Sequence, residues 1–383
     1  CTLDFYDSGF IFDVPDLTSC QPSGAVSLQA VRLDDTTQAC VADGGFAGAT
    51  KPVHFWSSYS NPLTGTEQVA LGGTDIGTSS PGTGLSLSFD ASETASIDVT
   101  YPDAGQVQLH ARYDGVGIDE AGRVMQGSDS FTARPVGLCV YSDDANSDCG
   151  SGNGSCSAFR AVDQVFNLKV KGVCWESSGD TDYCSGNSTT PNYEQNGIPI
   201  VQSLVAPTSA GSSAGSIGVS SIDIIDADNG EHVVANQTVS EVGVYRFTAT
   251  PPAYFGITLP AAASDTIGRF IPDHLVSTIT ENGVLEDSCS GFTYSGQPFG
   301  YDTSVALPTL QIRATDSAGN TVVNYRDDFV KLTSPATQIN MPSVTSDAST
   351  LGDDGSTLLA LSWNPGTSSL VAQNDGTLNF TLG

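Results

Sequence analysis

Basic side chains are scarce in this sequence of 383 residues. Only 13 lysines and arginines stand against 43 aspartates and glutamates, which gives a formal net charge of -30 at pH 7. Such a charge repels polyanions, so nucleic acid and anionic membrane surfaces are not expected partners. Long apolar runs are missing as well, because no stretch approaches the roughly 20 residues that a spanning helix needs. We therefore expect no nucleic-acid binding and no membrane insertion.

Helical periodicity is nearly absent too. Apolar and polar residues instead alternate in short runs bounded by glycine, proline, aspartate and serine, which is typical of half-buried β-strands joined by turns. Hydrophobic residues make up 39% of the chain, enough for packed cores. Because the chain is too long for one sandwich of about 100 residues, the sequence predicts an all-β fold of tandem immunoglobulin-like β-sandwich modules.

A short alternating run that ends in proline occurs three times and marks the head of each predicted module. The prolines are Pro15, Pro135 and Pro272. Their spacings of about 120 and about 137 residues suit a β-sandwich. The predicted modules are residues 1–134, residues 135–267, which are rich in cysteine, and residues 268–383.

Each head is followed by a strand-like segment that runs into an acidic or glycine-containing turn. Near the ends of the first two modules, residues 103–109 and 241–247 both have the pattern acid-x-Gly-x-apolar-x-apolar. In immunoglobulin-like sandwiches this spacing marks the corner that leads into strand F, and Tyr245 is a candidate tyrosine-corner residue. The three predicted strands after the heads are 26–30, 166–170 and 310–314.

The third module lacks the acid-x-Gly pattern before it ends at residues 378–383. We interpret it as an incomplete sandwich, whose last strands either lie beyond this sequence or come from a partner by strand addition. An unpaired sheet edge would otherwise favour aggregation.

Nine cysteines, several of them only a few residues apart, indicate disulfides and therefore an oxidising, exported location. Zinc binding would favour Cys-x-x-Cys steps, which the sequence lacks. Because the count is odd, at least one cysteine has no internal partner, and Cys289 or Cys1 is the candidate. The preferred pairs are Cys139 with Cys174, on neighbouring strands, and Cys149 with Cys156, and the other expected disulfide cysteines are Cys20 and Cys40.

Acidic loops around the clustered cysteines offer oxygen ligands for calcium. The sequence has no twelve-residue EF-hand pattern, and solvation explains most carboxylates in so acidic a chain. Calcium is the one cofactor that we consider. Its candidate ligands are Asp143, Asp144, Asn146, Asp148, Asp180 and Asp182.

Residues 211–215 match the Gly-x-Ser-x-Gly pattern of nucleophilic serines, but no apolar strand precedes them and no helix follows. The surrounding small-residue tract, 206–218, predicts a flexible loop instead. Paired carboxylates occur on solvated turns, and the four histidines have no metal-binding spacing. We assign no catalytic residue and expect a protein that is not an enzyme. The histidines are His54, His110, His232 and His274.

Seven segments across most of the chain resemble the C-terminal region of MshQ-like proteins. The resemblance implies a protein encoded with the mannose-sensitive haemagglutinin type IV pilus machinery and exported to the outer surface of Gram-negative bacteria. It brings no catalytic residues, and Cys20 departs from the family's pattern. The segments are 3–16, 53–59, 101–106, 127–131, 173–176, 239–244 and 268–274.

The resemblance also implies a larger protein, often with a lectin-like domain upstream. This agrees with the start at Cys1, which we read as internal rather than as the result of signal-peptide removal or lipoprotein processing. The leading hypothesis is a pilus-associated surface stalk or adhesin-like component that binds pilus subunits or a surface glycan or protein receptor. The alternatives are an assembly subunit that forms homo-oligomers or filaments by strand addition, and a secreted glycan-active hydrolase.

Overall fold

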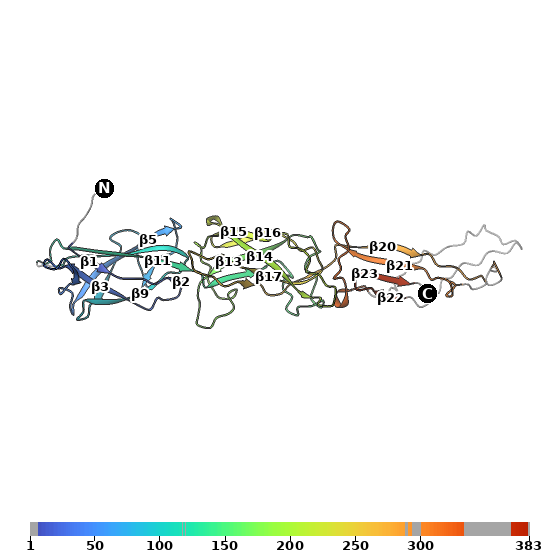
Figure 1. Cartoon of the computed structure of the whole chain (residues 1–383), viewed down its shortest axis with the longest axis horizontal. Helices are drawn as coiled ribbons and strands as arrows, with labels where there is room; N and C mark the ends of the chain where they lie inside the picture. The colour runs from blue at the N-terminus through green and yellow to red at the C-terminus, as the bar shows by residue number, and fades with distance from the viewer. Residues whose placement is uncertain are drawn as a thin grey trace.

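The computed structural model describes residues 7–116, 118, 120–287, 290–292, 300–332 and 369–381. Nearly all regular structure in these residues is β-strand, and the strands form three groups that lie end to end along an elongated molecule (Figure 1). The only helices found there are two single 3-10 turns, far too short to cross a membrane. The predicted all-β fold of tandem immunoglobulin-like modules is confirmed.

The first module contains one hydrogen-bonded sheet that wraps around its core. The order along the sheet is β7-β6-β9-β3-β1-β11-β10-β5-β8, and β2 pairs with β11 while β4 pairs with β3. The strands are β1 (Ser8–Ile11), β2 (Leu17–Thr18), β3 (Ala25–Leu33), β4 (Cys40–Ala42), β5 (Thr50–Asn61), β6 (Ala70–Leu71), β7 (Thr74–Asp75), β8 (Thr83–Ser88), β9 (Thr94–Thr100), β10 (Gly105–Asp114) and β11 (Val124–Arg134).

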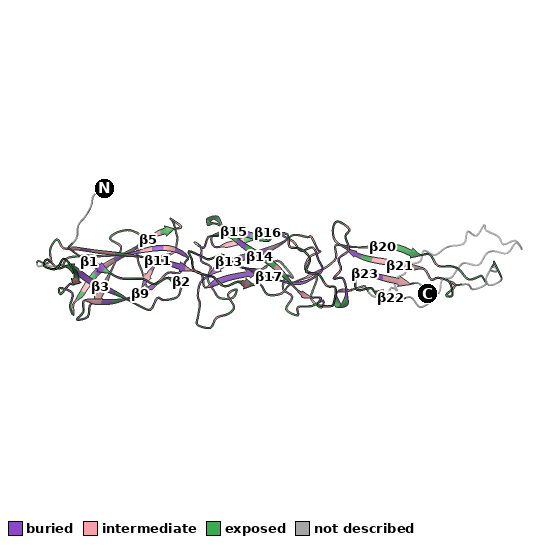
Figure 2. Ribbon diagram, in the orientation of Figure 1, coloured by how far each residue is buried: buried purple, intermediate pink, exposed green. Residues whose placement is uncertain are grey.

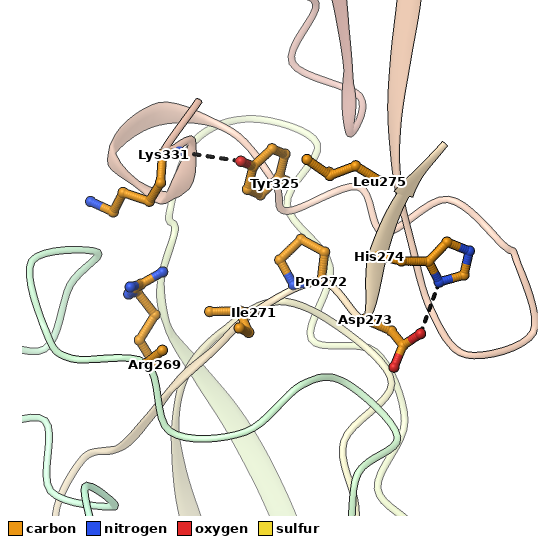
Figure 3. A pocket seen from close by; sticks show the side chains of 9 residues that line it. Arg269, Ile271, Pro272, Asp273, His274, Leu275, Tyr325 and Lys331 are labelled. Atoms are coloured by element: carbon orange, nitrogen blue, oxygen red, sulfur yellow. Dashed lines mark hydrogen bonds and ion pairs between the residues drawn. The ribbon is translucent and has the colours of Figure 1, made fainter. Parts of the chain in front are cut away.

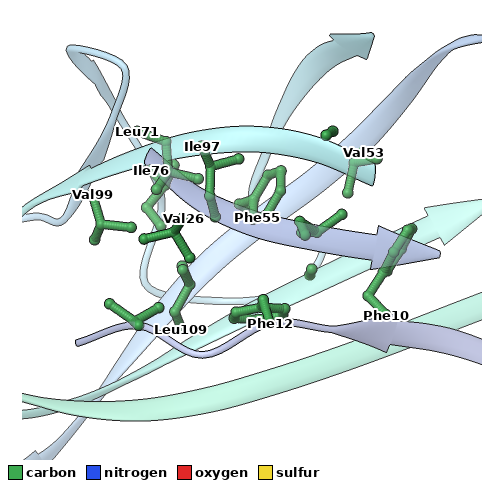
Figure 4. Close-up of a cluster of buried hydrophobic side chains, with 14 of the residues drawn as sticks. Phe10, Phe12, Val26, Val53, Phe55, Leu71, Ile76, Ile97, Val99 and Leu109 are labelled. Atoms are coloured by element: carbon green, nitrogen blue, oxygen red, sulfur yellow. The ribbon is translucent and has the colours of Figure 1, made fainter. Parts of the chain in front are cut away.

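Alternation in the sequence directs every second side chain of these strands into the core. In β10, every second residue from Val107 to Tyr113 is fully or almost fully buried, whereas the residues between them are partly exposed. Figure 4 shows apolar side chains from several strands that point toward one another inside the sheet. The ring of Phe46 packs edge-on against Phe10, Phe89 and Tyr113 in this core.

The second module is a sandwich of two sheets. The first has the order β12-β13-β16 and the second β15-β14-β17-β18, with β19 also paired to β17. Buried side chains from both sheets meet in one core, where the rings of Phe166, Phe247 and Phe270 are in contact. The strands are β12 (Gly137–Tyr141), β13 (Phe166–Val173), β14 (Gln195–Ala206), β15 (Ser221–Ile224), β16 (Glu231–Gln237), β17 (Gly243–Ala249), β18 (Ala262–Ala263) and β19 (Ile267–Phe270), with a 3-10 turn, η1, at Asp226–Asp228.

In its described residues the third module has one sheet, with the order β20-β21-β23-β22. Ile279, Leu310 and Phe380 lie side by side on one face, and β20 is largely exposed (Figure 2). The interpretation of this module as incomplete stays a prediction. The elements are β20 (His274–Glu281), β21 (Thr309–Thr315), β22 (Ser369–Ala372), β23 (Thr377–Thr381) and the 3-10 turn η2 (Asp327–Phe329).

The three strands predicted after the module heads are present as β3, β13 and β21. The predicted boundary at 134/135 falls between β11 and β12. The one at 267/268 falls inside β19, which pairs with β17 of the second module. We therefore propose that the second module ends after Phe270, a few residues later than the sequence pattern indicated.

Candidate functional site at the joints between modules

Buried charges mark the places where the modules meet. Four charged side chains are buried in the described part of the chain: Asp43, Asp103, Glu241 and Arg326. Asp43 forms an ion pair with Arg123 inside the first module, but the other three lie at the two joints. Because a buried charge is costly unless it has partners, the joints are the candidate functional sites of this chain.

A disulfide between Cys20 and Cys174 crosses the first joint, with 5.4 Å between the Cα atoms. Cys20 follows β2 of the first module, and Cys174 follows β13 of the second. Backbone hydrogen bonds surround the bond: the Trp175 N–H donates to the carbonyl of Ser19 at 3.0 Å, and the Cys20 N–H donates to the carbonyl of Tyr101 at 2.8 Å. The two modules are therefore joined covalently as well as by their single connecting segment.

The predicted pair of Cys139 and Cys174 is wrong. Cys139 lies opposite Lys171 in the register of β12 and β13, so Cys174 is three residues along the strand, roughly 10 Å away and beyond disulfide reach. Cys139 instead bonds Cys184. The predicted bond between Cys149 and Cys156 is present in the structure.

A bond between Cys20 and Cys40 is also ruled out, because Cys40 has a free, exposed thiol on β4. Cys20 lies at the joint with Cys174 as its partner. Cys1 and Cys289, the candidates for the unpaired cysteine, lie outside the described residues.

The carboxylate of Asp103 receives hydrogen bonds from both modules at the first joint. Its Oδ1 accepts the N–H of Ala104 at 2.7 Å and the N–H of Asn192, in the second module, at 2.8 Å. Its Oδ2 is buried and has no partner among the described residues. Burial, followed by the nearby Glu67 carboxylate, raises the pKa of Asp103 to about 6, and the two N–H donors oppose this rise.

Glu241 occupies the corresponding position at the second joint. Its Oε1 accepts the N–H of Val242 at 2.9 Å and that of Asn324 at 3.1 Å, while its Oε2 accepts the N–H of Val323 at 3.0 Å. Val323 and Asn324 belong to the third module. Burial raises the pKa of Glu241, although the three N–H donors and the Arg326 guanidinium counter this effect.

Arg326 and Asn324 anchor the small-residue loop of the second module. The Arg326 guanidinium, which is only 2% exposed, donates to the carbonyls of Ala210 at 2.7 Å and Gly211 at 3.3 Å. Asn324 accepts the Ser213 N–H at 2.9 Å and donates to the Ser213 carbonyl at 2.7 Å. The loop was predicted to be flexible, but this part of it is held by the third module.

The repeated acid-x-Gly pattern therefore has a role that the sequence did not reveal. In both copies the acid accepts the N–H of the next residue and at least one N–H from the following module. The glycines, Gly105 and Gly243, begin β10 and β17 with φ of 129° and 155°. The corner prediction also holds in the second copy, since the Tyr245 hydroxyl donates to the Glu241 carbonyl at 3.0 Å.

Apolar side chains complete the second joint. Val242 and Val244 of the second module pack with Tyr325, Phe329 and Leu378 of the third in one buried cluster. The core of the third module is thus continuous with this joint.

A hollow of about 300 Å³ lies beside the second joint (Figure 3). Arg269 and Lys331 lie on one side of it, and neither forms a salt bridge in the described residues. Asp273 lies on the other side, 2.8 Å from His274 Nδ1. The lining contains no serine, threonine or cysteine. The full lining is Ala158, Arg269, Ile271, Pro272, Asp273, His274, Leu275, Tyr325 and Lys331.

Two of the other three histidines also have side-chain partners. His110 stacks on Trp56 with 4.9 Å between ring centroids, and His232 Nδ1 lies 3.0 Å from the Asp228 carboxylate. His54 lies on β5, opposite Gly84. In the described residues, no three histidine, cysteine or acidic side chains are grouped so that they could hold a metal ion.

The candidate calcium ligands are divided between separate partners. Asp143 pairs with Lys169 at 2.6 Å, and Asp144 pairs with Arg160 at 3.1 Å. Asp180 accepts the Asp182 N–H at 2.9 Å. Asp182 accepts the Cys184 N–H at 3.2 Å, Asp148 forms an isolated bridge with Ile267, and Asn146 has a left-handed backbone with φ of 65°.

Comparison with protein families gives one consistent match. Residues 1–128 match the model described as "Domain of unknown function (DUF6701), first Ig-like domain". Residues 134–237 match the second domain of the same family, and residues 241–382 match the third. The search of curated proteins finds no match.

Several solved structures are similar at low identity. Invasin, a bacterial integrin-binding protein, is 12% identical over 98% of this chain and 54% of its own, with a TM-score of 0.34. InvD of Yersinia pseudotuberculosis is 12% identical over 82% of this chain and 72% of its own, with a TM-score of 0.26. The D0-D1 domain of intimin is 11% identical over 67% and 99%, with a TM-score of 0.19. This chain thus spans about half of the invasin chain.

Proposed function

Because the chain belongs to the DUF6701 family and carries its three domains, we propose that it is a non-enzymatic stalk of a bacterial surface protein. Its task is to hold an adhesin-like binding element at a distance from the cell. The observation that carries this proposal is the construction of the joints, where a buried carboxylate binds backbone N–H groups of the next module. A stalk needs such joints, since freely hinged modules would fold back on one another.

An extracellular location is supported by the three disulfides, since such bonds persist in oxidising compartments. The net charge of -30 suits a solvated surface protein. We further propose that the protein is associated with a type IV pilus, and the resemblance to MshQ-like proteins supports this. Immunogold labelling of intact cells tests it. Label along or at the tips of filaments is expected, whereas label confined to the cell interior would contradict the proposal.

The second candidate is an assembly subunit joined by strand addition. The partly exposed apolar face of the third-module sheet, with Ile279 at 66% exposure, favours it. Charged substitutions at Ile279 and at Leu310, its neighbour on β21, would abolish such an association. Size-exclusion chromatography with light scattering distinguishes the candidates, because a stalk stays monomeric at every concentration and an assembly subunit does not.

A further inference from the structure

The bond between Cys20 and Cys174 closes a covalent ring around most of the first module. The two cysteines are 154 positions apart in sequence, and every strand from β3 to β13 lies between them. Only β1 and β2 of the first module lie before the ring. Cys20 and Cys174 are therefore connected in two ways: through 154 residues of chain, and directly through the disulfide.

We propose that this disulfide carries tension past the first module, so that pulling on the two ends of the chain leaves the body of that module unloaded. Tension follows the shortest covalent path, which enters the disulfide at Cys20 and leaves it at Cys174. The peptide between these residues is slack however hard the ends are pulled. The inference deepens the proposed function and rests on it for its meaning, because a surface stalk is the kind of protein that is pulled.

The loaded part of the first module is its N-terminal segment. β1 pairs with β3 and β11, and β2 pairs with β11. Phe10, Phe12, Val14 and Leu17 anchor this segment in the core. A sufficient force would peel it away, after which the tension would meet the disulfide and go no further into the module.

The bond between Cys139 and Cys184 is interlocked with the first one. Cys139 lies inside the ring and Cys184 lies beyond it. While the first bond is intact, the second is not on the shortest path. If the first bond is opened, tension runs through the first module to Cys139 and crosses there to Cys184. The Cys139–Cys184 bond thus carries tension only after the Cys20–Cys174 bond has opened, and the maximum extended length of the chain depends on which of the two bonds are closed.

These lengths follow from the positions of the cysteines. Opening only the Cys20–Cys174 bond adds roughly 110 residues to the loaded path, on the order of 380 Å at about 3.5 Å per residue. Complete reduction adds roughly 154 residues, on the order of 540 Å. Opening only the Cys139–Cys184 bond adds nothing.

The test is single-molecule pulling of the full chain by handles at its two ends. The maximum extended length of the oxidised wild type should not include the chain between Cys20 and Cys174. The C20S/C174S variant should gain the intermediate length, and the matched control, C139S/C184S, should have the wild-type length. Adding a reductant to the held wild-type protein should release the full additional length, which keeps the test valid if a variant does not fold.

The proposal is overturned if the oxidised wild type already extends by the additional length calculated for complete reduction, or if reduction of the held chain adds no length. Immunogold labelling is a separate readout. If the pulled lengths agree with the values above but the label is intracellular, the stalk function is contradicted and the role of the disulfide under tension stands. If the lengths disagree but the label is on the cell surface, the role of the disulfide is contradicted and the stalk function stands.

Discussion

The carboxylate of Asp103 accepts the backbone N–H of Asn192 at 2.8 Å, and these two residues belong to different modules. Glu241 and Asn324 repeat this relationship at the second joint, at 3.1 Å. Each joint therefore depends on a buried acid that belongs to the module before it.

Acidification from pH 7 to pH 4 should tighten the first joint. The pKa of Asp103 is about 6 when docked, above its ordinary value of 3.8, so between these values the docked form binds a proton that the open form does not. Ionisation of the buried Asp103 carboxylate opposes docking at pH 7, and this free-energy cost falls away as the pH drops through 6 toward 4. The expected gain is on the order of 2 kcal/mol.

Differential scanning calorimetry at pH 4.5 and pH 7 measures this effect. The raised pKa of Glu241 acts in the same direction at the second joint. Asp103→Asn keeps an oxygen for the two N–H donors and removes the charge, so it should lose the Asp103 share of the pH dependence, leaving that of Glu241, without loss of stability at pH 7. An unchanged pH dependence in this variant would contradict the assignment to Asp103.

Glu241→Ala should destabilise the second joint by about 3 kcal/mol or more, because three backbone N–H groups lose their acceptor in a buried site. Glu241→Gln retains an acceptor and should cost less. Urea unfolding followed by a probe in the third module measures the change. Glu176→Ala, which removes an exposed acid, is the matched control, and equal effects of the two alanine variants would contradict the role of Glu241.

Gly105→Ala should cost about 2–4 kcal/mol. A Cβ at this position would meet the carbonyl oxygen of Asn61 at 2.6 Å, and the backbone φ of 129° is unfavourable for other residues. Gly24 also has a positive φ but has open space around it, so Gly24→Ala should cost only about 1 kcal/mol. Thermal melting of both variants separates the clash from the backbone effect, and similar losses would show that the clash is absent.

Removal of divalent cations should leave the melting temperature unchanged. Asp143 and Asp144 already have Lys169 and Arg160 as ion-pair partners, so their loops do not need calcium to relieve repulsion. Melting curves with a chelator and with added calcium check this. A rise of several degrees on addition of calcium would revive the cation site predicted from the sequence.

The strands and the repeated motif were predictable because both depend on local patterns. Alternation along β10 and the paired acid-x-Gly segments are visible in the chain itself. The partners of Asp103 and Glu241 were not predictable, because Asn192 and Asn324 are more than 80 positions away from these acids in the sequence. Both also donate through the backbone N–H, which every residue except proline has.

The disulfides illustrate the same limit. Cys149 and Cys156 are close in sequence, and the sequence predicted the disulfide between them that the structure contains. Neighbouring strands were correctly placed around Cys139, but the register that excludes Cys174 comes from the pairing of β12 with β13. Cys20 and Cys174 meet only because two modules dock end to end, and spacing within the sequence contains no signal of that docking.

Small-angle X-ray scattering of the full oxidised chain at pH 7 tests the central claim that the joints hold the modules in line. We predict one extended particle whose maximum dimension and profile match the end-to-end arrangement of Figure 1. The same profile at higher salt would exclude charge repulsion as its cause. A broad distribution of sizes, or a particle with the modules folded against one another, would contradict it.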